Sequence, residues 1–167
     1  MNIYLVGMSG SGKSALGRAL AKKLNMVFLD TDFEISKRYG KSPEAMIENE
    51  GEAALRQAEL GILERIQNKD NLLVATGGGF PIFNNIMDTL NETGVTIYLS
   101  YSPKMLWKRL QKSHKRPLVK TKKDVENLLK ERQDIYEQAK IIYPGKYKFH
   151  ANLQAMGKII TAFHEKK

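Results

Sequence analysis

The hydrophobic residues of the chain alternate between short continuous runs and longer segments in which they recur every three or four positions. Short apolar runs are typical of buried parallel strands, and the longer spacing is typical of amphipathic helices. The strands predicted in this way cover residues 2–6, 27–29, 71–75 and 95–99, with a fifth, weakly marked strand at 149–153. Because strands and helices alternate along the chain, the sequence predicts an α/β fold with a parallel sheet.

The predicted helices carry recognisable periodicity and start signals. Leu16 and Leu20 lie four positions apart in the first helix. Ser42 and Pro43 are typical of a helix start, and Gly51 divides the segment that follows into two helices. The helical segments predicted are 14–24, 42–68 with its break at Gly51, 82–90, 102–111, 125–143 and 156–163.

Composition sets limits on the class of protein. The chain has 167 residues, 42% hydrophobic and 27% charged, so it can bury a core as one domain. It contains no cysteine, which excludes disulfides and thiolate chemistry and favours a reducing compartment. No apolar run reaches the length of a membrane helix, and no basic leader precedes the first strand. We therefore expect a cytoplasmic protein with no membrane partner.

The net charge of +9 has three explanations. A basic surface can bind nucleic acid, a positive cleft can concentrate anionic small molecules, and lysines can also be scattered over solvated helix faces. The sequence shows no ribbon of alternating aromatic and basic residues of the kind that stacks nucleobases. We therefore expect no nucleic-acid partner.

Residues 7–14, GMSGSGKS, match the phosphate-binding pattern G-x-x-x-x-G-K-[ST] in full and lie between a predicted strand and a predicted helix. In that setting, backbone N–H groups and the helix dipole point at phosphate oxygens. Gly10 and Gly12 permit the positive φ values that such a loop needs. Lys13 would reach the β- and γ-phosphates, and the Ser14 hydroxyl would hold Mg²⁺. The alternative is a plain glycine-rich turn, but the full match indicates a nucleoside triphosphate site.

Two further clusters follow predicted strands. Asp30 and Asp32 come directly after the second strand, where they could serve Mg²⁺ and an acceptor hydroxyl; the alternative is helix capping by Thr31 or Asp32. The third strand ends in three consecutive glycines, 77–79, which bring backbone close to another group or simply form a tight turn. Because the carboxyl ends of parallel strands meet at one edge of a sheet, we expect these clusters to lie together.

Two basic features complete the candidate chemistry. Arg56 lies beside an apolar helical stripe, where it could face a ligand or form an exposed ion pair with Glu52 or Glu59. Residues 112–123 are basic, contain a proline and show no periodicity. In a nucleotide enzyme such a segment can close over phosphates as a lid, although it could also be a solvated loop.

Taken together, these stretches resemble the shikimate kinase family over nearly the whole chain, from residue 2 to about residue 163. The marker positions are the phosphate loop at 7–14, LDTD at 29–32, GEAALR at 51–56, GGG at 77–79, RPL at 116–118, and Arg132 with Tyr136 and Ala139.

The resemblance implies a P-loop kinase fold, with three α/β/α layers around a five-stranded parallel sheet of order 2-3-1-4-5. It implies one domain, residues 1–167, in which about 31–60 form a helical substrate-binding insertion and about 112–124 form a mobile lid. The implied reaction is ATP-dependent phosphorylation of the 3-hydroxyl of shikimate, with Mg²⁺, in the pathway to chorismate and the aromatic amino acids. The expected partners are shikimate and ATP, and the expected form is a monomer.

The family pattern also implies the acceptor-binding residues. Asp32 corresponds to the catalytic group that holds and deprotonates the hydroxyl. Arg56 and Arg132 correspond to the pair that binds the shikimate carboxylate, and planar guanidinium groups suit a carboxylate well. The backbone that meets the ring hydroxyls is implied to be Gly77, Gly78 and Gly79.

On the nucleotide side, Lys13 and Arg116 are implied as catalytic cations, with Arg116 swinging onto the phosphates from the lid. Arg109 corresponds to the residue that stacks on adenine. Ser14 and Asp30 are implied to serve Mg²⁺, Asp30 through water. The full set of nucleotide-binding positions is Gly10, Ser11, Gly12, Lys13, Ser14, Ala15, Arg109 and Arg116.

The chain departs from the family pattern in places. Ile47 and Leu55 stand where phenylalanines often surround the substrate, Lys115 where glycine is frequent, and Asp134 where proline is common. Residues 150–153, on the adenine side, match the pattern poorly. Two alternatives remain open: a kinase of the same fold acting on another small hydroxy acid such as gluconate, and a non-catalytic nucleotide-binding or nucleic-acid-binding protein.

Overall fold

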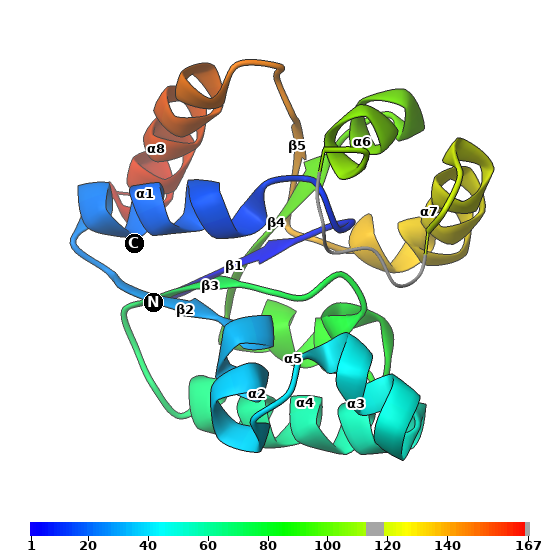
Figure 1. The fold of residues 1–167 in the computed structure, drawn as a ribbon. Coiled ribbons are helices and arrows are strands. Elements are labelled where there is room, and N and C mark those ends of the chain that lie inside the picture. Colours follow the sequence, from blue (N-terminus) through cyan, green and yellow to red (C-terminus); the bar gives the residue numbers. More distant parts are fainter. Residues whose placement is uncertain (113–118, 166–167) are drawn as a thin grey trace.

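A computed structural model of the chain describes residues 1–112 and 119–165. These residues form one parallel sheet of five strands in the order β2-β3-β1-β4-β5 (Figure 1). The strands are β1 (Asn2–Val6), β2 (Val27–Asp30), β3 (Leu72–Ala75), β4 (Gly94–Ser100) and β5 (Ile141–Pro144). The predicted parallel sheet and its order 2-3-1-4-5 are therefore confirmed.

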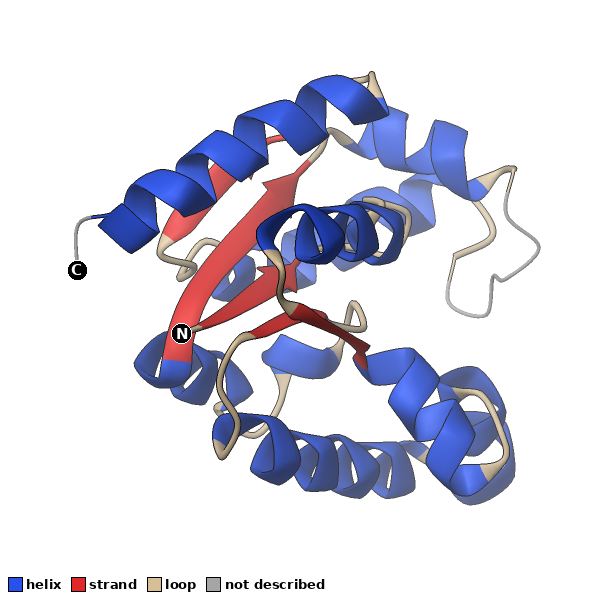
Figure 2. Ribbon diagram, turned by 90° about the vertical axis from the view of Figure 1, so that its left-hand side faces the viewer, coloured by secondary structure: helices blue, strands red, loops and turns tan. Residues whose placement is uncertain are grey.

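Helices cover both faces of this sheet. α1 and α8 lie together on one face, and α4 and α5 lie on the other, which gives the predicted three layers (Figures 1 and 2). In the described part of the chain, no helix is both long and apolar enough to cross a membrane. The helices are α1 (Lys13–Leu24), α2 (Thr31–Tyr39), α3 (Pro43–Glu50), α4 (Glu52–Gln67), the 3₁₀ helix η1 (Phe80–Ile82), α5 (Ile86–Thr93), α6 (Pro103–Leu110), α7 (Lys122–Tyr136) and α8 (Phe149–Glu165).

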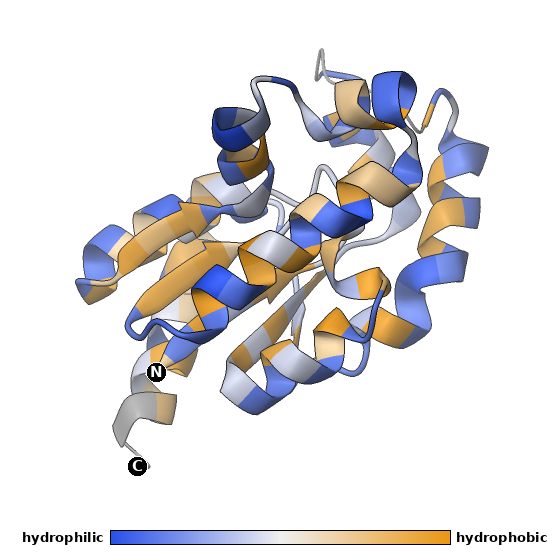
Figure 3. Cartoon of the chain, turned by 90° about the horizontal axis from the view of Figure 1, so that it is seen from below, coloured by the Kyte–Doolittle hydropathy of each residue, from blue (hydrophilic) through white to orange (hydrophobic). Residues whose placement is uncertain are grey.

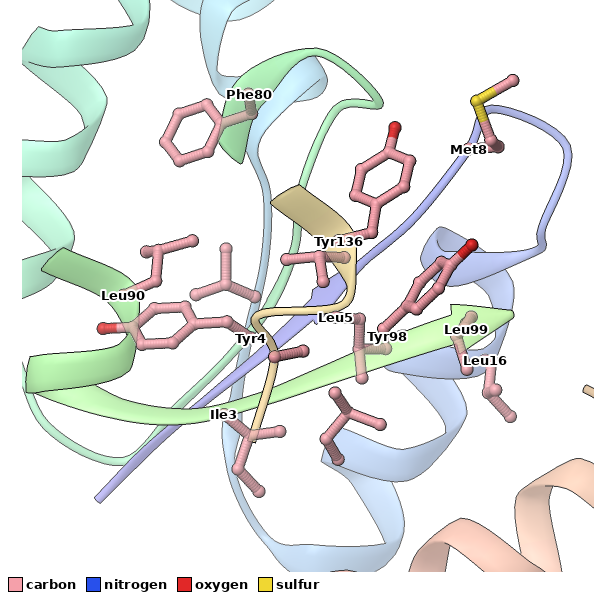
Figure 4. Close-up of a cluster of buried hydrophobic side chains, with 14 of the residues drawn as sticks. Ile3, Tyr4, Leu5, Met8, Leu16, Phe80, Leu90, Tyr98, Leu99 and Tyr136 are labelled. Atoms are coloured by element: carbon pink, nitrogen blue, oxygen red, sulfur yellow. The ribbon is translucent and has the colours of Figure 1, made fainter. Parts of the chain in front are cut away.

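The core is built around the central strand β1, whose five residues are all buried. Its side chains pack against those of α1, α5 and β4 in the cluster shown in Figure 4. Tyr98 of β4 stacks on Tyr136 of α7 with ring centroids 5.2 Å apart, so α7 is tied to the strand next to the central one. Figure 3 shows mostly hydrophobic strands and helices that carry both hydrophobic and polar faces, as a three-layer packing requires.

The predicted break at Gly51 is confirmed. Gly51 adopts φ 90°, a left-handed value that suits glycine, and it separates α3 from α4. Ser42 caps α3 by accepting a hydrogen bond from the Ala45 N–H at 3.1 Å, and Pro43 occupies the first helical position. These local signals fix where α3 begins and where α3 gives way to α4.

The prediction was wrong for residues 137–155. The expected helix 125–143 begins earlier, at Lys122, and ends at Tyr136, and residues 141–144 form the edge strand β5 in register with β4. The weakly predicted strand 149–153 is instead the start of α8. The β-branched and aromatic residues of β5 favour a strand, and Pro144 is tolerated because β5 is an edge strand.

The segment after the glycines also differs from its prediction. A helix was expected over 82–90, but the chain makes the short 3₁₀ helix η1 first and enters α5 only at Ile86. Asn84 and Asn85 have φ values of 56° and 54°, a conformation that asparagine tolerates better than most residues. These two residues delay the start of the helix.

Candidate active site

The phosphate loop connects β1 to α1 at the carboxyl edge of the sheet. Gly10 and Gly12 have φ values of 83° and 84°, as the motif requires. A Cβ at Gly10 would also lie 2.9 Å from a Leu110 carbon, so only glycine fits there. Lys13 is buried and its Nζ donates to the carbonyl oxygens of Gly7 and Met8, at 2.7 and 2.8 Å. Burial lowers the pKa of Lys13 to about 8 against the opposing attraction of nearby Asp32.

Asp30 links the loop to the next helix. Its carboxylate accepts hydrogen bonds from the Ser14 hydroxyl and, at 3.1 Å, from the Phe33 N–H, so Asp30 is the residue that caps α2. Thr31 and Asp32, the residues considered as caps, do not have this role. The pair supplies one hydroxyl and one carboxylate oxygen, the ligand types that suit Mg²⁺ beside a nucleotide phosphate. Within residues 1–112 and 119–165, no group of three or more histidine, cysteine, aspartate or glutamate side chains is arranged so that it could hold a metal ion.

Asp32 points from the first turn of α2 at the glycine loop. Its carboxylate fills the space where a side chain at Gly77 would lie, since a Cβ built on Gly77 overlaps Asp32 Oδ1. Burial and, second to it, the negative charge of Asp30 raise the pKa of Asp32 to about 6, against the opposing attraction of Lys13. A carboxylate with a pKa near neutrality suits a group that accepts a proton from a hydroxyl.

The glycine loop is held from two directions. Thr31 is fully buried, and its Oγ1 accepts a hydrogen bond from the Gly77 N–H at 2.8 Å. The buried Tyr136 hydroxyl donates to the Gly78 carbonyl at 2.6 Å. Tyr136 was recognisable from the sequence only as a family marker, and Thr31 only as a possible cap. The available signals were their places, Thr31 between the two aspartates and Tyr136 four residues after Arg132.

Arg56 forms the ion pairs that were one of its two predicted roles, and it also lines a cavity. It forms ion pairs with Glu59, at 2.6 Å, and Glu52, at 3.0 Å, and its guanidinium lies 3.7 Å from the centroid of the Phe83 ring. Its side chain is only 14% exposed. Arg56 Nε is buried and has no hydrogen-bond partner among the described residues. Burial raises the pKa of Glu59, which the hydrogen bond from Arg56 opposes.

Arg132 reaches the same place from α7. It is 7% exposed, and its Nη1 lies 3.2 Å from the Cβ position of Gly78. The Cβ position of Gly79 is 3.2 Å from Arg56 Nη1 and 3.5 Å from Arg132 Nη2. Two guanidinium groups from distant parts of the chain therefore meet at the glycine loop, an arrangement that can hold a carboxylate.

Two neighbouring cavities organise these groups. One, of about 170 Å³, is lined by Arg56 and Arg132, by the glycine loop, and by apolar side chains that include Ile47 and Leu55. The other, of about 400 Å³, is lined by the phosphate loop together with Asp30. Asp32 lines both cavities, as do Gly77 and Gly78. Asp32 thus lies between the cavity at the phosphate loop and the cavity that the two arginines line.

Arg109, another predicted nucleotide-binding residue, lies beside a third cavity. Arg109 donates from Nη1 to the Ser11 carbonyl at 3.2 Å, and its guanidinium lies 4.3 Å from the centroid of the Tyr101 ring. It lines this third cavity together with Gly10, Gly12 and Ala15 of the phosphate loop. Arg116, the predicted lid arginine, lies outside the described residues.

Comparison with known proteins agrees with this geometry. The shikimate kinase family profile matches residues 9–162. The shikimate kinase of Bacteroides fragilis is 36% identical over 150 residues, which cover 86% of this chain and 84% of that protein. The shikimate kinase of Persephonella marina is 37% identical over 161 residues, which cover 95% of this chain and 98% of that protein.

Solved structures agree as well. A shikimate kinase from Acinetobacter baumannii in complex with shikimate superposes with a TM-score of 0.90 at 31% identity, covering 99% of this chain and 94% of that one. A gluconokinase from Sinorhizobium meliloti reaches a TM-score of 0.59 at 16% identity, which shows a shared fold alone. The comparisons thus favour the shikimate kinase prediction over the gluconate alternative. The chain is a kinase with a P-loop fold, and it belongs to the shikimate kinase family.

Proposed function

We propose that this chain transfers the γ-phosphoryl group of ATP to the 3-hydroxyl of shikimate, giving shikimate 3-phosphate and ADP. The observation that carries the proposal is the position of Asp32, which lines both the phosphate cavity and the acceptor cavity. Family membership supports ATP as the donor, and the relative solved with shikimate supports the acceptor. Phosphoryl transfer depends on positioning and on neutralising charge, and this arrangement serves both needs.

The acceptor would bind through its carboxylate and its hydroxyls. Arg56 and Arg132 would each donate hydrogen bonds to the carboxylate from a planar guanidinium group. Arg56 would keep or give up its ion pairs with Glu52 and Glu59 when the carboxylate binds. The backbone of the glycine loop would meet the ring hydroxyls, because its lack of side chains allows close approach. Ile47 and Leu55 would pack against the ring as the apolar wall.

The reaction would run between the two cavities. Asp32 would accept the proton of the 3-hydroxyl while the hydroxyl oxygen forms a bond to the γ-phosphorus. The bond between the γ-phosphorus and the β,γ-bridging oxygen would break at the same time, which releases ADP. Lys13 and, from the lid, Arg116 would stabilise the charge on the phosphoryl oxygens. Ser14 and Asp30 would hold Mg²⁺, which would neutralise phosphate charge when bound.

We further propose that the chain works as one domain and as a cytoplasmic monomer. Residues from about 31 to about 60 would bind the acceptor. Outside the glycine loop, most residues that line the acceptor cavity belong to α2, α3 and the start of α4. Residues of about 112–124 would close over the nucleotide, although 122–124 already form the first turn of α7. A cytoplasmic location would supply ATP and suits a chain without cysteine.

The test is acceptor-dependent ADP release from Mg-ATP. Shikimate should support release, whereas gluconate or no acceptor should not. Asp32→Asn should remove the shikimate-dependent release while ATP still binds. Glu34→Gln is the matched control, because Glu34 lies on the same helix and pairs only loosely with Arg65, at 3.6 Å. Release with gluconate alone would reassign the acceptor, and full activity of Asp32→Asn would overturn the role of the carboxylate.

A further inference from the structure

One face of the Arg56 guanidinium is covered by an aromatic ring from another part of the chain. Phe83 directly follows η1, and the centroid of its ring lies 3.7 Å from Arg56 Cζ. Phe83 is half-buried. Among the residues that the structure describes, those lining the acceptor cavity include Arg56 but not Phe83. The ring therefore meets the acceptor site through the arginine.

The ring leaves the hydrogen-bonding edges of the guanidinium open. All five N–H groups of a guanidinium lie in its plane, so a ring on its face uses none of them. Nη1 and Nη2 of Arg56 donate to Glu59 and Glu52. Arg56 Nε is buried, and no described residue accepts a hydrogen bond from it. The guanidinium thus keeps unused N–H groups while one of its faces is covered.

The segment that carries Phe83 continues the glycine loop. The Phe80 N–H donates to the Gly77 carbonyl at 3.1 Å. The Ile82 N–H donates to the Gly79 carbonyl, also at 3.1 Å. These bonds join the glycine loop to η1, and Phe83 is the next residue. The aromatic ring and the glycine loop therefore belong to one hydrogen-bonded unit.

This unit contacts the guanidinium twice. The Cβ position of Gly79 lies 3.2 Å from Arg56 Nη1, and the Phe83 ring covers the face. Buried Glu59 also holds Nη1, but a contact at one nitrogen does not fix the plane. Glu52 is 58% exposed, and exposed ion pairs contribute little. A ring attracts a guanidinium more strongly when water is excluded, and the Arg56 side chain is only 14% exposed.

We propose that Phe83 is a positioning residue for acceptor binding, because its ring sets the plane of the Arg56 guanidinium. The unused in-plane N–H groups would then face the acceptor carboxylate together with those of Arg132. A guanidinium and a carboxylate form two parallel hydrogen bonds when their planes match, so a tilted guanidinium would hold the acceptor less well. The inference deepens the proposed function and rests on it for the identity of the acceptor.

The first experiment tests the stack without any ligand. Nitrogen-15–proton correlation NMR detects arginine Nε–H groups, and the Arg56 signal is identified by its loss in Arg56→Lys. The Phe83 ring current should shift this signal. Phe83→Leu should therefore move it, and Phe83→Tyr, which keeps the ring, should not. Phe163→Leu is the control, because it makes the same substitution at an exposed residue of α8. An Arg56 signal that moves no more in Phe83→Leu than in this control would overturn the stack.

The second experiment measures the consequence for the acceptor. In calorimetric titrations, Phe83→Leu should bind shikimate about threefold or more weakly. In assays, its KM for shikimate should rise while kcat and the KM for ATP stay within about twofold of the unmodified protein. Phe83→Tyr and Phe163→Leu should behave like the unmodified protein. If Phe83→Leu fails to fold, Phe83→Met also removes the ring and keeps an apolar side chain. Equal losses for shikimate and ATP would indicate a general structural role and overturn the proposal.

A double-mutant cycle tests whether Phe83 acts through Arg56. A lysine has no plane for the ring to orient, so Phe83→Leu should change shikimate affinity by less than about twofold in the Arg56→Lys protein. Losses that simply multiply would overturn the route through Arg56. Failure of the proposed function has a different signature, since the unmodified protein would then bind no shikimate. The NMR comparison would still decide whether Phe83 holds the guanidinium.

Discussion

The carboxylate of Asp32 occupies the volume that any side chain at residue 77 would need. The two residues come from different strands' ends, and the Thr31 hydroxyl ties them together by accepting from the Gly77 N–H. The position of Asp32, the proposed base, therefore depends on residue 77 being glycine, which has no Cβ.

Gly77→Ala should displace the Asp32 carboxylate and lower kcat/KM for shikimate by about a hundredfold, as expected for a misplacement of about 1 Å. Steady-state assays with shikimate varied measure the effect. Gly61→Ala is the control, because the nearest atom to a Cβ there is 3.9 Å away and the site is helical. A Gly77→Ala enzyme with the activity of the unmodified protein would show that the carboxylate does not act from this position.

The activity should depend on pH through the coupled pair Asp32 and Lys13. Asp32 must be ionised to accept a proton, and its pKa is raised to about 6, so kcat/KM should rise as pH increases through about 6. Lys13 must be protonated, and its pKa is lowered to about 8, so kcat/KM should fall above about 8. A pH profile of kcat/KM between 5 and 9.5 measures both limbs. An acid limb centred near the ordinary carboxyl pKa of 3.8 would contradict the environment described for Asp32.

Asp32→Asn should stabilise the protein while inactivating it. The pKa of Asp32 is higher in the folded chain than its ordinary value of 3.8, so the folded state binds more protons between about pH 4 and 6. The free energy of unfolding therefore falls as pH rises through this window. At neutral pH the ionised Asp32 carboxylate destabilises the folded state. Urea denaturation at pH 7.5 should show the variant more stable by about 1–3 kcal/mol, with a smaller difference at pH 4.5. A variant less stable at pH 7.5 would contradict this.

Arg56→Lys should weaken acceptor binding selectively. A lysine cannot form the planar fork, so the KM for shikimate should rise about tenfold or more while the KM for ATP stays the same. Arg65→Lys is the control on the same helix, because Arg65 is 48% exposed and makes only a loose ion pair with Glu34. Equal changes in both KM values would indicate a general disturbance of the fold instead.

Much of the fold was predictable because its signals are local. The phosphate loop, the two aspartates and the triple glycine each follow a strand directly, so the parallel sheet brings them to one edge. The segment after Tyr136 was mispredicted because the apolar stripe of α7 continues through Ala139 in the sequence. Only pairing with β4 makes residues 141–144 a strand, and that pairing joins parts of the chain about forty residues apart.

The residues that the structure brings together at the glycine loop were named from the sequence, but their contacts were not. Arg56 pairs with both Glu52 and Glu59 while facing the acceptor cavity, so the two interpretations of this residue do not exclude each other. The supports of the glycine loop, Thr31 and Tyr136, could not be assigned from sequence because their hydrogen bonds join distant segments.

The most direct test of the central claim is to identify the bond that is made. After incubation with Mg-ATP and shikimate, phosphorus-31 and proton NMR of the product should show one phosphate monoester on the oxygen at carbon 3. Asp32→Asn should give none of it under the same conditions. An ester at another hydroxyl, or ADP and inorganic phosphate as the only new species, would contradict the placement of Asp32 between donor and acceptor.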